Sequence, residues 1–433
     1  MRIAIITAGG AGMFCGSCMQ DNTAARALRR AGDDVILVPT YTPIRVDEEN
    51  VSANRVLLGG VNVFLDTALP GWNRLPAWMT GWLNHPTMVR WFCRLGSDPD
   101  PAKLGRLTLD MLKGTAGPQQ HEMRELVNYL CGELRPDVIL FSNSLLSGVL
   151  SELRARFSGK ILCLLQGDDI FLEALDTRWK RPVLEQLRRN CMLVDSFLTH
   201  SAYYRDFMAD YLDLPKDRIR QVPLSIDTSH CDDPPGTAET RCRSESVQGT
   251  FRIGYFARIC PEKGVQNLLE AAGTVLPELP RVDIGIAGYL PPRHRRWFQR
   301  RLKQAQAVAP HRIHWLDSPG SRTEKLRLIS RFNLLCVPTE YHEPKGIYVL
   351  EAASVGVPAL LPRHGVFPEL VERLGHGMLY DPGKKDNLVA GLRHATEKYA
   401  TIPSGLPGQV REHFDMHATA PHLRRALAEC LTE

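Results

Sequence analysis

Short apolar runs alternate with longer amphipathic stretches along the first half of the chain, which is the pattern of strands and helices in turn. A helix is predicted over residues 21–30, because Ala24, Ala25 and Leu28 share one face. Gly32, just past this segment, is a typical helix terminator. The apolar runs predict buried parallel strands at residues 2–7, 35–38, 138–141, 161–165 and 197–199. Strands that alternate with helices indicate a doubly wound parallel sheet.

The alternation stops near residue 228 and then restarts. Residues 228–249 are rich in Thr, Ser, Asp, Pro and Arg and lack periodicity, which is typical of a linker. After this linker, strands are predicted at residues 252–256, 282–287, 312–316 and 333–337, and helices at residues 264–272, 347–355 and 417–431. The chain therefore contains a second Rossmann-like half.

Two domains are expected, one at residues 1–227 and one at residues 250–414, each with a Rossmann-like parallel sheet. The last helix, at about residues 415–433, is expected to pack back on the first domain. A chain of 433 residues suits two domains of roughly 200 residues each. Ligands bind outside the carboxyl ends of the strands in open α/β sheets, so a central cleft faced by both sheets is the expected binding region.

The composition narrows the class of protein. Hydrophobic residues make up 44% of the chain and charged residues 23%, which is typical of a soluble globular protein. The net charge of +5 is spread out, which fits either an ordinary solvated surface or a preference for anionic ligands such as phosphates and lipid headgroups. The first residues do not show the pattern of a secretory signal peptide. No apolar run approaches the roughly 18–20 residues of a membrane span. The 11 cysteines are scattered along the chain. We therefore expect a cytoplasmic protein with no nucleic-acid partner.

The clearest chemical pattern is EPKGIYVLEAASVGVP at residues 343–358. Glu343 is predicted in the loop after a strand, and Glu351 inside the next helix. Backbone N–H groups around Gly346, at the start of that helix, are expected to be free to donate. A carboxylate accepts two hydroxyl hydrogen bonds at once, which suits the vicinal diol of a sugar or ribose. The alternative is a loop acid and a solvated helix acid without a ligand.

A second pattern, GYFARICPEKG, occupies residues 254–264. Arg258 follows a predicted strand, and Lys263 precedes a helix expected to begin at Gly264. Two cations and a helix N-terminus at one place suit a diphosphate. The alternative is a surface turn with ordinary charges.

Together these patterns resemble the large retaining glycosyltransferase family 4, which has the GT-B fold of two Rossmann-like domains facing a cleft. That family shows an Arg…Lys-Gly phosphate motif and two glutamates in a Glu-x7-Glu motif followed by Gly-x-Pro. The matching residues here are Arg258, Lys263-Gly264, Glu343, Glu351-Ala352 and Gly356-Val357-Pro358. Ala257 stands where the family usually has glycine, and Ser225-Ile226-Asp227 resembles its Gly-(Val/Ile)-Asp. The resemblance covers nearly the whole chain and is strongest over residues 250–400.

The resemblance implies roles for these residues. Arg258 and Lys263 would bind the donor diphosphate, and Glu351 the ribose hydroxyls. Glu343 would hold the donor sugar together with the backbone around Gly346, so the neighbouring Lys345 and Ile347 are also expected in the donor site. The first domain would be the acceptor side and the second the nucleotide-sugar side.

The glycine-rich loop after the first strand contains Gly9, Gly10 and Gly12. By the resemblance, Gly10 and Gly12 would lie across the cleft near the donor phosphates. A loop of this kind also occurs as a simple tight turn between a strand and a helix, so both interpretations stay open.

The chain departs from the family at Gln166, where the family usually has histidine. A glutamine donates a hydrogen bond to a sugar hydroxyl but carries no charge. Either the histidine is dispensable or the activity is altered. Asp168 is a further candidate for a sugar or acceptor contact, the alternative being a helix N-cap for Asp168 and Asp169.

A tryptophan-rich segment at residues 69–113 has interleaved arginines and several prolines. Trp78 and Trp82 are its candidate acceptor contacts, because aromatic rings beside cations suit sugar stacking or a membrane interface. Three interpretations stay open: a hydrophobic cluster beneath an insertion, an acceptor or lid segment, and membrane contact.

Two smaller features of the sequence are a cysteine pair and a basic stretch. Cys15 and Cys18 form a CxxC without a second pair at zinc spacing, so incidental loop cysteines are the simplest interpretation and a redox role is a weaker one. A basic stretch around residues 293–301 indicates a solvated helix face.

The expected function is transfer of a sugar from a UDP-, GDP- or ADP-sugar to an unidentified hydroxyl acceptor, with retention and without a cofactor or metal. The alternatives are a nucleotide-sugar epimerase or phosphorylase of the same fold and a non-catalytic sugar-binding relative.

Overall fold

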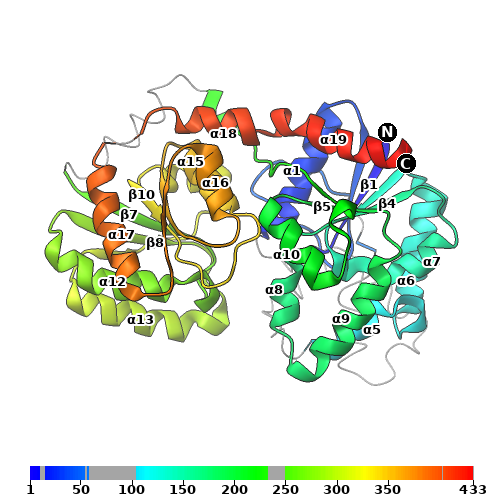
Figure 1. The fold of residues 1–433 in the computed structure, drawn as a ribbon, viewed down its shortest axis with the longest axis horizontal. Coiled ribbons are helices and arrows are strands. Elements are labelled where there is room, and N and C mark those ends of the chain that lie inside the picture. Colours follow the sequence, from blue (N-terminus) through cyan, green and yellow to red (C-terminus); the bar gives the residue numbers. More distant parts are fainter. Residues whose placement is uncertain (10–14, 54–55, 58–103, 233–248, 402, 433) are drawn as a thin grey trace. The chain divides into compact units, whose positions relative to one another are not determined.

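The computed structural model describes residues 1–9, 15–53, 56–57, 104–232, 249–401 and 403–432. The chain divides into two compact units: unit 1, Met1–Ser225 with Thr419–Glu433, and unit 2, Ile226–Ala418. Each unit is built around its own parallel sheet (Figure 1). The candidate acceptor residues Trp78 and Trp82 lie outside the described residues, as do Gly10 and Gly12 and most of the expected linker.

The described part of unit 1 contains a six-stranded parallel sheet in the order β2-β1-β3-β4-β5-β6. The strands are β1 (Arg2–Thr7), β2 (Asp34–Pro39), β3 (Val138–Phe141), β4 (Lys160–Leu164), β5 (Ser196–Thr199) and β6 (Ile219–Gln221). The chain runs from β1 to β2 on one side and then crosses to β3 on the other. The strand order therefore reverses between β1 and β3, where ligands usually bind in sheets of this type.

Helices cover both faces of the unit 1 sheet. They are α1 (Gly16–Arg30), α5 (Gly105–Leu112), α6 (Gln120–Asn128), α7 (Leu150–Arg154), α8 (Asp168–Glu173), α9 (Thr177–Cys191) and α10 (Ala202–Leu212), followed at the chain end by α19 (Met416–Thr432). Successive β1 side chains point to opposite faces, so Ile3 and Ile5 enter one core cluster, and Ala4 and Ile6 enter the other.

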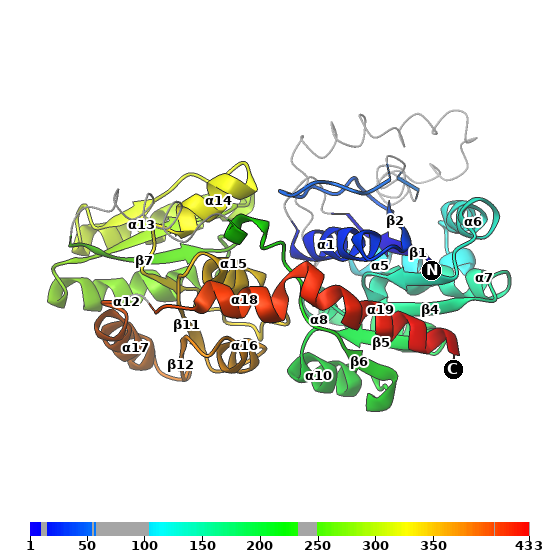
Figure 2. The ribbon, with the colours of Figure 1, turned by 90° about the horizontal axis from the view of Figure 1, so that it is seen from above.

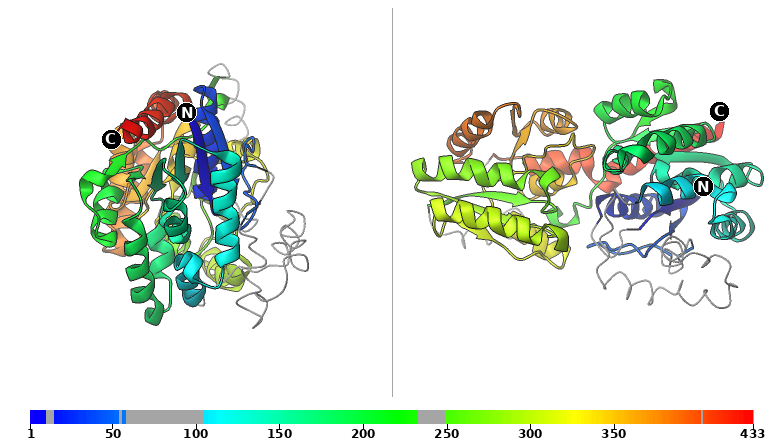
Figure 3. Two further views of the ribbon diagram at one scale, coloured as in Figure 1. Left: turned by 90° about the vertical axis from the view of Figure 1, so that its right-hand side faces the viewer. Right: turned by 90° about the horizontal axis from the view of Figure 1, so that it is seen from below.

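The last helix completes one of these clusters. Ala426, Leu427 and Cys430 of α19 are buried with Ile3 of β1 and Leu28 of α1. Helices α1 and α19 lie side by side (Figure 2), and α19 returns beside the first strand (Figure 3). Burial of this apolar face explains why a helix so distant in sequence is part of unit 1.

Unit 2 repeats the architecture over its described residues, with the strand order β12-β11-β10-β7-β8-β9 and all pairs parallel. Its strands are β7 (Phe251–Phe256), β8 (Val282–Ala287), β9 (Ile313–Trp315), β10 (Leu334–Cys336), β11 (Ala359–Pro362) and β12 (Met378–Tyr380). Its helices are α12 (Val265–Glu278), α13 (Arg295–Val308), α14 (Arg322–Ile329), α15 (Ile347–Ser354), α16 (Phe367–Leu374), α17 (Lys385–Lys398) and α18 (Leu406–Phe414). Its strand order reverses between β7 and β10.

The prediction of two Rossmann-like parallel sheets is confirmed. Some element bounds were wrong: α1 begins at Gly16 rather than at residue 21, and α12 continues to Glu278. Strands β6, β11 and β12, each of three or four residues, were missed. Among the described helices, none combines the length and apolar character needed to cross a bilayer.

Candidate functional site

Two loops meet at the carboxyl ends of β7 and β10 in unit 2. The β7 loop contains Arg258 and Lys263, and the β10 loop leads to Glu343. Gly264 has a φ of 73°, and a Cβ there would lie 1.7 Å from the carbonyl oxygen of Pro338. Only glycine allows this approach, so Gly264 brings Lys263 against the β10 loop.

Lys263 and Glu343 form a buried ion pair at this junction. Lys263 Nζ lies 2.5 Å from Glu343 Oε2, and the two side chains are 12% and 7% exposed. The hydroxyls of Tyr341 and Tyr348 donate to the same oxygen over 2.9 and 3.3 Å. The Lys263 ammonium lies 4.8 Å from the centre of each of these rings. Cation and carboxylate are therefore both held in place.

The surroundings keep Glu343 ionised. Burial by itself would raise its pKa, but the charge of Lys263 and the hydrogen bonds from Lys263 and Tyr341 outweigh burial and hold the pKa below its usual value. Burial and the Glu343 charge raise the pKa of both tyrosines, so they remain protonated donors. An ionised carboxylate is an acceptor only, which suits hydroxyl ligands.

The start of α15 approaches the same carboxylate. Gly346, with a φ of 72°, precedes the helix, and its N–H donates to Glu343 Oε1 over 3.4 Å. Of the N–H groups around Gly346 that were expected to be free, the one of Gly346 itself therefore has an acceptor within the protein. A Cβ on Gly365 would lie 2.6 Å from the Glu343 backbone nitrogen, so a second glycine packs against this loop. Lys345 is buried and Ile347 is half-buried beside Gly346.

Glu351 also has a cationic partner. Its Oε1 lies 2.5 Å from Lys325 Nζ, and the side chains are 5% and 7% exposed. Sequence reasoning missed Lys325 because α14 was not predicted. The available signal was its spacing: Lys325 lies four positions before the buried Ile329 on the same helix face.

Arg258 differs from these buried groups. Its side chain is exposed at the end of β7, and in the described part of the chain it forms no ion pair with a carboxylate. Its backbone is held by the Tyr255 hydroxyl, which donates to the Arg258 carbonyl over 3.0 Å. The guanidinium can therefore bind an anionic ligand without breaking an ion pair within the protein.

Gln166 in unit 1 connects the ends of three strands. Its Nε2 donates to Asp21 Oδ1 and to the carbonyl of Ser142, over 2.9 Å in each case. Thr7 Oγ1 donates to Asp21 Oδ2 over 2.6 Å. Both amide hydrogens of Gln166 therefore have acceptors inside unit 1, and a contact between Gln166 and a sugar stays a prediction.

Asp168 and Asp169 lie in the first turn of α8. Asp168 Oδ2 accepts hydrogen bonds from Ser144 N and Oγ over 2.9 and 2.7 Å. The Tyr204 hydroxyl donates to Asp169 Oδ1 over 2.6 Å. Burial raises the pKa of Asp168 to about 6, although the bonds from Ser144 act in the opposite direction. A buried carboxyl that titrates near neutrality is a candidate proton carrier.

This raised pKa predicts a pH dependence of stability. The pKa of Asp168 is higher in the folded chain than in the unfolded chain, where it is 3.8. The contribution of this carboxyl to folding stability is therefore greatest below pH 3.8 and is lost as the pH rises through about 6. Asp168→Asn mimics the protonated form. As the pH rises from 4 to 7, its free energy of unfolding should therefore increase by about 2–3 kcal/mol relative to that of wild type. Urea unfolding of both proteins across this range measures the difference. A constant difference would contradict the raised pKa.

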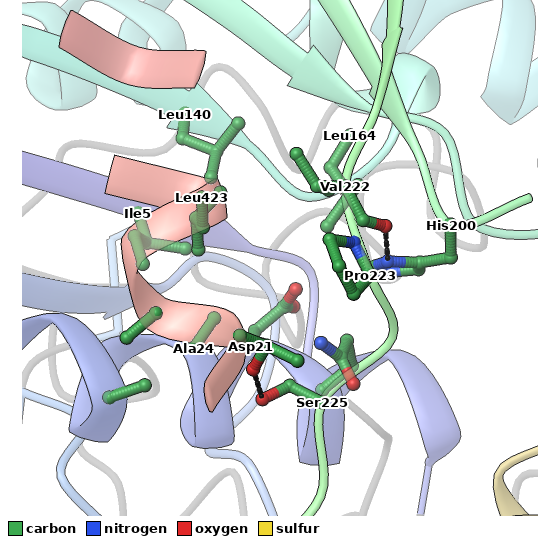
Figure 4. Close-up of a pocket in the computed structure, with 14 residues that line it drawn as sticks. Ile5, Asp21, Ala24, Leu140, Leu164, His200, Val222, Pro223, Ser225 and Leu423 are labelled. Carbon is green, nitrogen blue, oxygen red and sulfur yellow. Dashed lines mark hydrogen bonds between the residues drawn. The ribbon is translucent and has the colours of Figure 1, made fainter. Parts of the chain in front are cut away.

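A small cavity of about 20 Å³ lies beside this part of unit 1, lined among others by Asp21, His200 and Ser225 (Figure 4). His200 Nδ1 and the Val222 carbonyl are 3.3 Å apart, and Ser225 Oγ lies 2.7 Å from Thr419 Oγ1 of α19. A volume of this size suits about one water molecule. The cavity is therefore too small for a sugar.

Gly9, the residue of the glycine-rich loop that the structure describes, is needed for steric reasons. Gly9 has a φ of 89°, and a Cβ there would lie 2.1 Å from the Thr42 carbonyl oxygen. Gly9 thus allows a tight turn after β1. A phosphate contact by Gly10 and Gly12 stays a prediction.

Comparison with known family models gives a match to part of the chain. Residues 237–402 match the model of the family described as glycosyl transferases group 1. No curated protein matches the chain. The matched segment contains every residue of the Lys263–Glu343 and Lys325–Glu351 pairs.

Solved structures share the fold over nearly the whole chain. Sucrose-phosphate synthase from Thermosynechococcus elongatus has 16% identity and a TM-score of 0.72, with 99% of each chain covered. Anabaena Alr3699/HepE in complex with UDP has 15% identity and a TM-score of 0.66, with 99% of this chain and 100% of that chain covered. At these identities the likeness establishes the GT-B fold, and the family match supports a glycosyltransferase.

Proposed function

We propose that this protein transfers a sugar from a nucleoside diphosphate sugar to an acceptor hydroxyl. The observation that carries the proposal is the Lys263–Glu343 pair, which joins a cation and an ionised carboxylate at the point where the unit 2 strand order reverses. The pair lies within the segment that matches glycosyl transferases group 1. The cation suits an ion pair with a diphosphate, and the carboxylate suits hydrogen bonds from sugar hydroxyls.

The two cations would bind the donor diphosphate in different ways. The Lys263 ammonium has three N–H donors, so it can contact Glu343 and still donate to a phosphate oxygen. The exposed Arg258 can bind phosphate in a bidentate manner. As the glycosidic bond breaks, the leaving diphosphate gains negative charge, which both groups would stabilise.

The carboxylates would position the rest of the donor. Glu343 would accept hydrogen bonds from donor sugar hydroxyls, and Glu351 from the ribose, with Lys325 fixing its orientation. In this proposal the acceptor attacks from the face that the diphosphate leaves, with retention, and its proton passes to a phosphate oxygen. The positive charges of Arg258 and Lys263 would then serve in place of a divalent metal.

A ligand screen tests the proposal. Thermal unfolding should be measured with UDP, GDP, ADP and their sugars, with UDP first because Anabaena Alr3699/HepE has been solved with UDP and with UDP-glucose. A ligand at 100 times its Kd should stabilise the protein by about 2.7 kcal/mol. Sugar transfer in EDTA, with the anomeric configuration of the product determined by NMR, tests the metal and retention parts. Absence of a shift with every nucleotide would overturn the proposal.

Arg258→Ala is expected to weaken donor binding about 10- to 100-fold, because it removes a charge-assisted hydrogen bond worth about 1.5–3 kcal/mol. Thermal stability without ligand should change little, since the side chain is exposed. Arg281→Ala is a matched control, because Arg281 is exposed just before β8, at the opposite end of the strands. Equal donor Kd values for the two variants would remove Arg258 from the site.

A further inference from the structure

Cys15 and Cys18 lie at the start of α1, directly after the loop that follows β1. Cys15 is the N-cap residue, with an extended backbone, and Cys18 lies in the first turn. A CxxC at the first helix of a βαβ unit is the arrangement found in thiol–disulfide redox sites. The structure thus places both cysteines at the position where this chemistry occurs.

The two cysteines stand three positions apart in the cap and first turn of α1, and the side chain of Cys15 is the largest cause of the raised pKa of Cys18. Cys15 is half-buried, whereas Cys18 is 2% exposed and belongs to a core cluster. The hydrogen bond with Cys15, burial and nearby negative charges raise the pKa of Cys18. An accessible first thiol and a buried second thiol are the division between an attacking and a resolving cysteine.

The N-cap position favours a thiolate at Cys15. The helix dipole stabilises negative charge at a helix N-terminus, and α1 has no acidic residue in its first turn, although the Cys15 side chain accepts no capping hydrogen bond from the helix. Helix N-termini lower cysteine pKa values for this reason. Cys15 therefore has both the access and the electrostatic environment of a nucleophile.

Cys18 is also linked to the polar cluster at the strand ends of unit 1. Thr7 Oγ1 lies 4.0 Å from Cys18 Sγ and donates to Asp21 over 2.6 Å, and Asp21 accepts from Gln166. Oxidation of Cys18 Sγ would therefore alter the surroundings of the Thr7 hydroxyl, which belongs to the hydrogen bonds that join β1 and β4.

We propose that Cys15 and Cys18 form a reversible thiol–disulfide site. The Cys15 thiolate attacks one sulfur of a small oxidised disulfide such as glutathione disulfide, forms a mixed disulfide and releases one glutathione thiolate. Cys18, after losing its proton, attacks Cys15 Sγ, which forms the Cys15–Cys18 bond and releases the second glutathione. The pair loses two electrons and two protons, and glutathione disulfide gains them. The proposal is independent of sugar transfer.

A zinc site is the competing interpretation of a CxxC. Among the described residues there is no group of three or more His, Cys, Asp and Glu side chains arranged to hold a metal. Zinc sites use three or four protein ligands, so this pair is incomplete as a metal site. The described geometry therefore favours the redox interpretation.

Cys131 supplies a matched control. It is half-buried like Cys15, but it lies in a π-helical turn, Tyr129–Leu134, and burial raises its pKa. At pH 7, Cys15 should react with iodoacetamide at least tenfold faster than Cys131, as measured by peptide mass spectrometry. Equal rates would contradict a stabilised thiolate at Cys15.

The disulfide itself is tested with the full chain in glutathione buffers of increasing oxidised fraction. In wild type and Cys131→Ser, the single peptide that contains both Cys15 and Cys18 should lose two hydrogens, and dithiothreitol should restore them. Cys18→Ala should accumulate a glutathione adduct on Cys15, and Cys15→Ser should form neither product. Failure of wild type to form the disulfide, or stoichiometric zinc lost in the variants, would overturn the proposal.

Discussion

Lys263→Ala is expected to lower both the stability of the protein and its donor turnover. The change leaves the Glu343 carboxylate, 7% exposed, without its cation. Removing one partner of a buried ion pair typically costs about 3–5 kcal/mol. If Lys263 contacts the diphosphate, kcat/KM for the donor should also fall about 10- to 100-fold.

The pH dependence separates this effect from a general loss of packing. The pKa of Glu343 is lowered in the folded protein, so its contribution to stability is present above its unfolded value of 4.5 and is lost as the pH falls through the folded value. Without Lys263, burial should raise the Glu343 pKa instead. The stability difference between wild type and variant should therefore be largest near neutrality and shrink below about pH 4.5.

Urea unfolding from pH 3.5 to 7.5 measures this difference, and single-turnover kinetics measure donor use. The double variant Lys263→Met with Glu343→Gln is the control, because it removes both charges and should recover much of the stability without recovering turnover. A pH-independent loss of stability in Lys263→Ala would show that the ion pair does not set the stability of this site.

Glu351→Ala is expected to have a comparable effect on stability, because it leaves the Lys325 ammonium, 7% exposed, without a partner. A cost of about 3–5 kcal/mol is expected for Glu351→Ala and for Lys325→Ala. If Glu351 also binds the ribose, donor KM should rise more than kcat falls, because the ribose contact is similar in the ground and transition states.

A double-mutant cycle with Lys325→Met and Glu351→Gln measures the coupling between the two side chains. Lys325→Met keeps the Glu351 carboxylate, so it should alter stability more than donor KM. If the two single variants raise donor KM equally, Glu351 acts through the ion pair alone and the ribose contact is wrong. Additive stability losses would mean that the ion pair is weak.

The family resemblance pointed to two loops that the structure brings together at the ends of β7 and β10, but not to the partners within them. Arg258, Lys263, Glu343 and Glu351 were predicted as site residues because charged residues and glycines occur there at a recognisable spacing. The burial and pairing of Lys263 and Glu343 were not visible in the sequence, because these residues are 80 positions apart and meet only through the pairing of β7 with β10. The same holds for Gln166 and Asp21, which are 145 positions apart.

Hydrophobic periodicity predicted most strands of the two parallel sheets, because burial on both faces of a strand requires a continuous apolar run such as residues 282–287. It also located the last helix, α19, since its apolar face is periodic. Only the tertiary structure decided that Gly346 N–H is used by Glu343, that Lys325 neutralises Glu351, and that Cys15 caps α1 while Cys18 is buried in its first turn. Hydrogen bonds and ion pairs depend on distances of a few ångströms between segments far apart in the chain, and residue spacing along the sequence does not determine such distances.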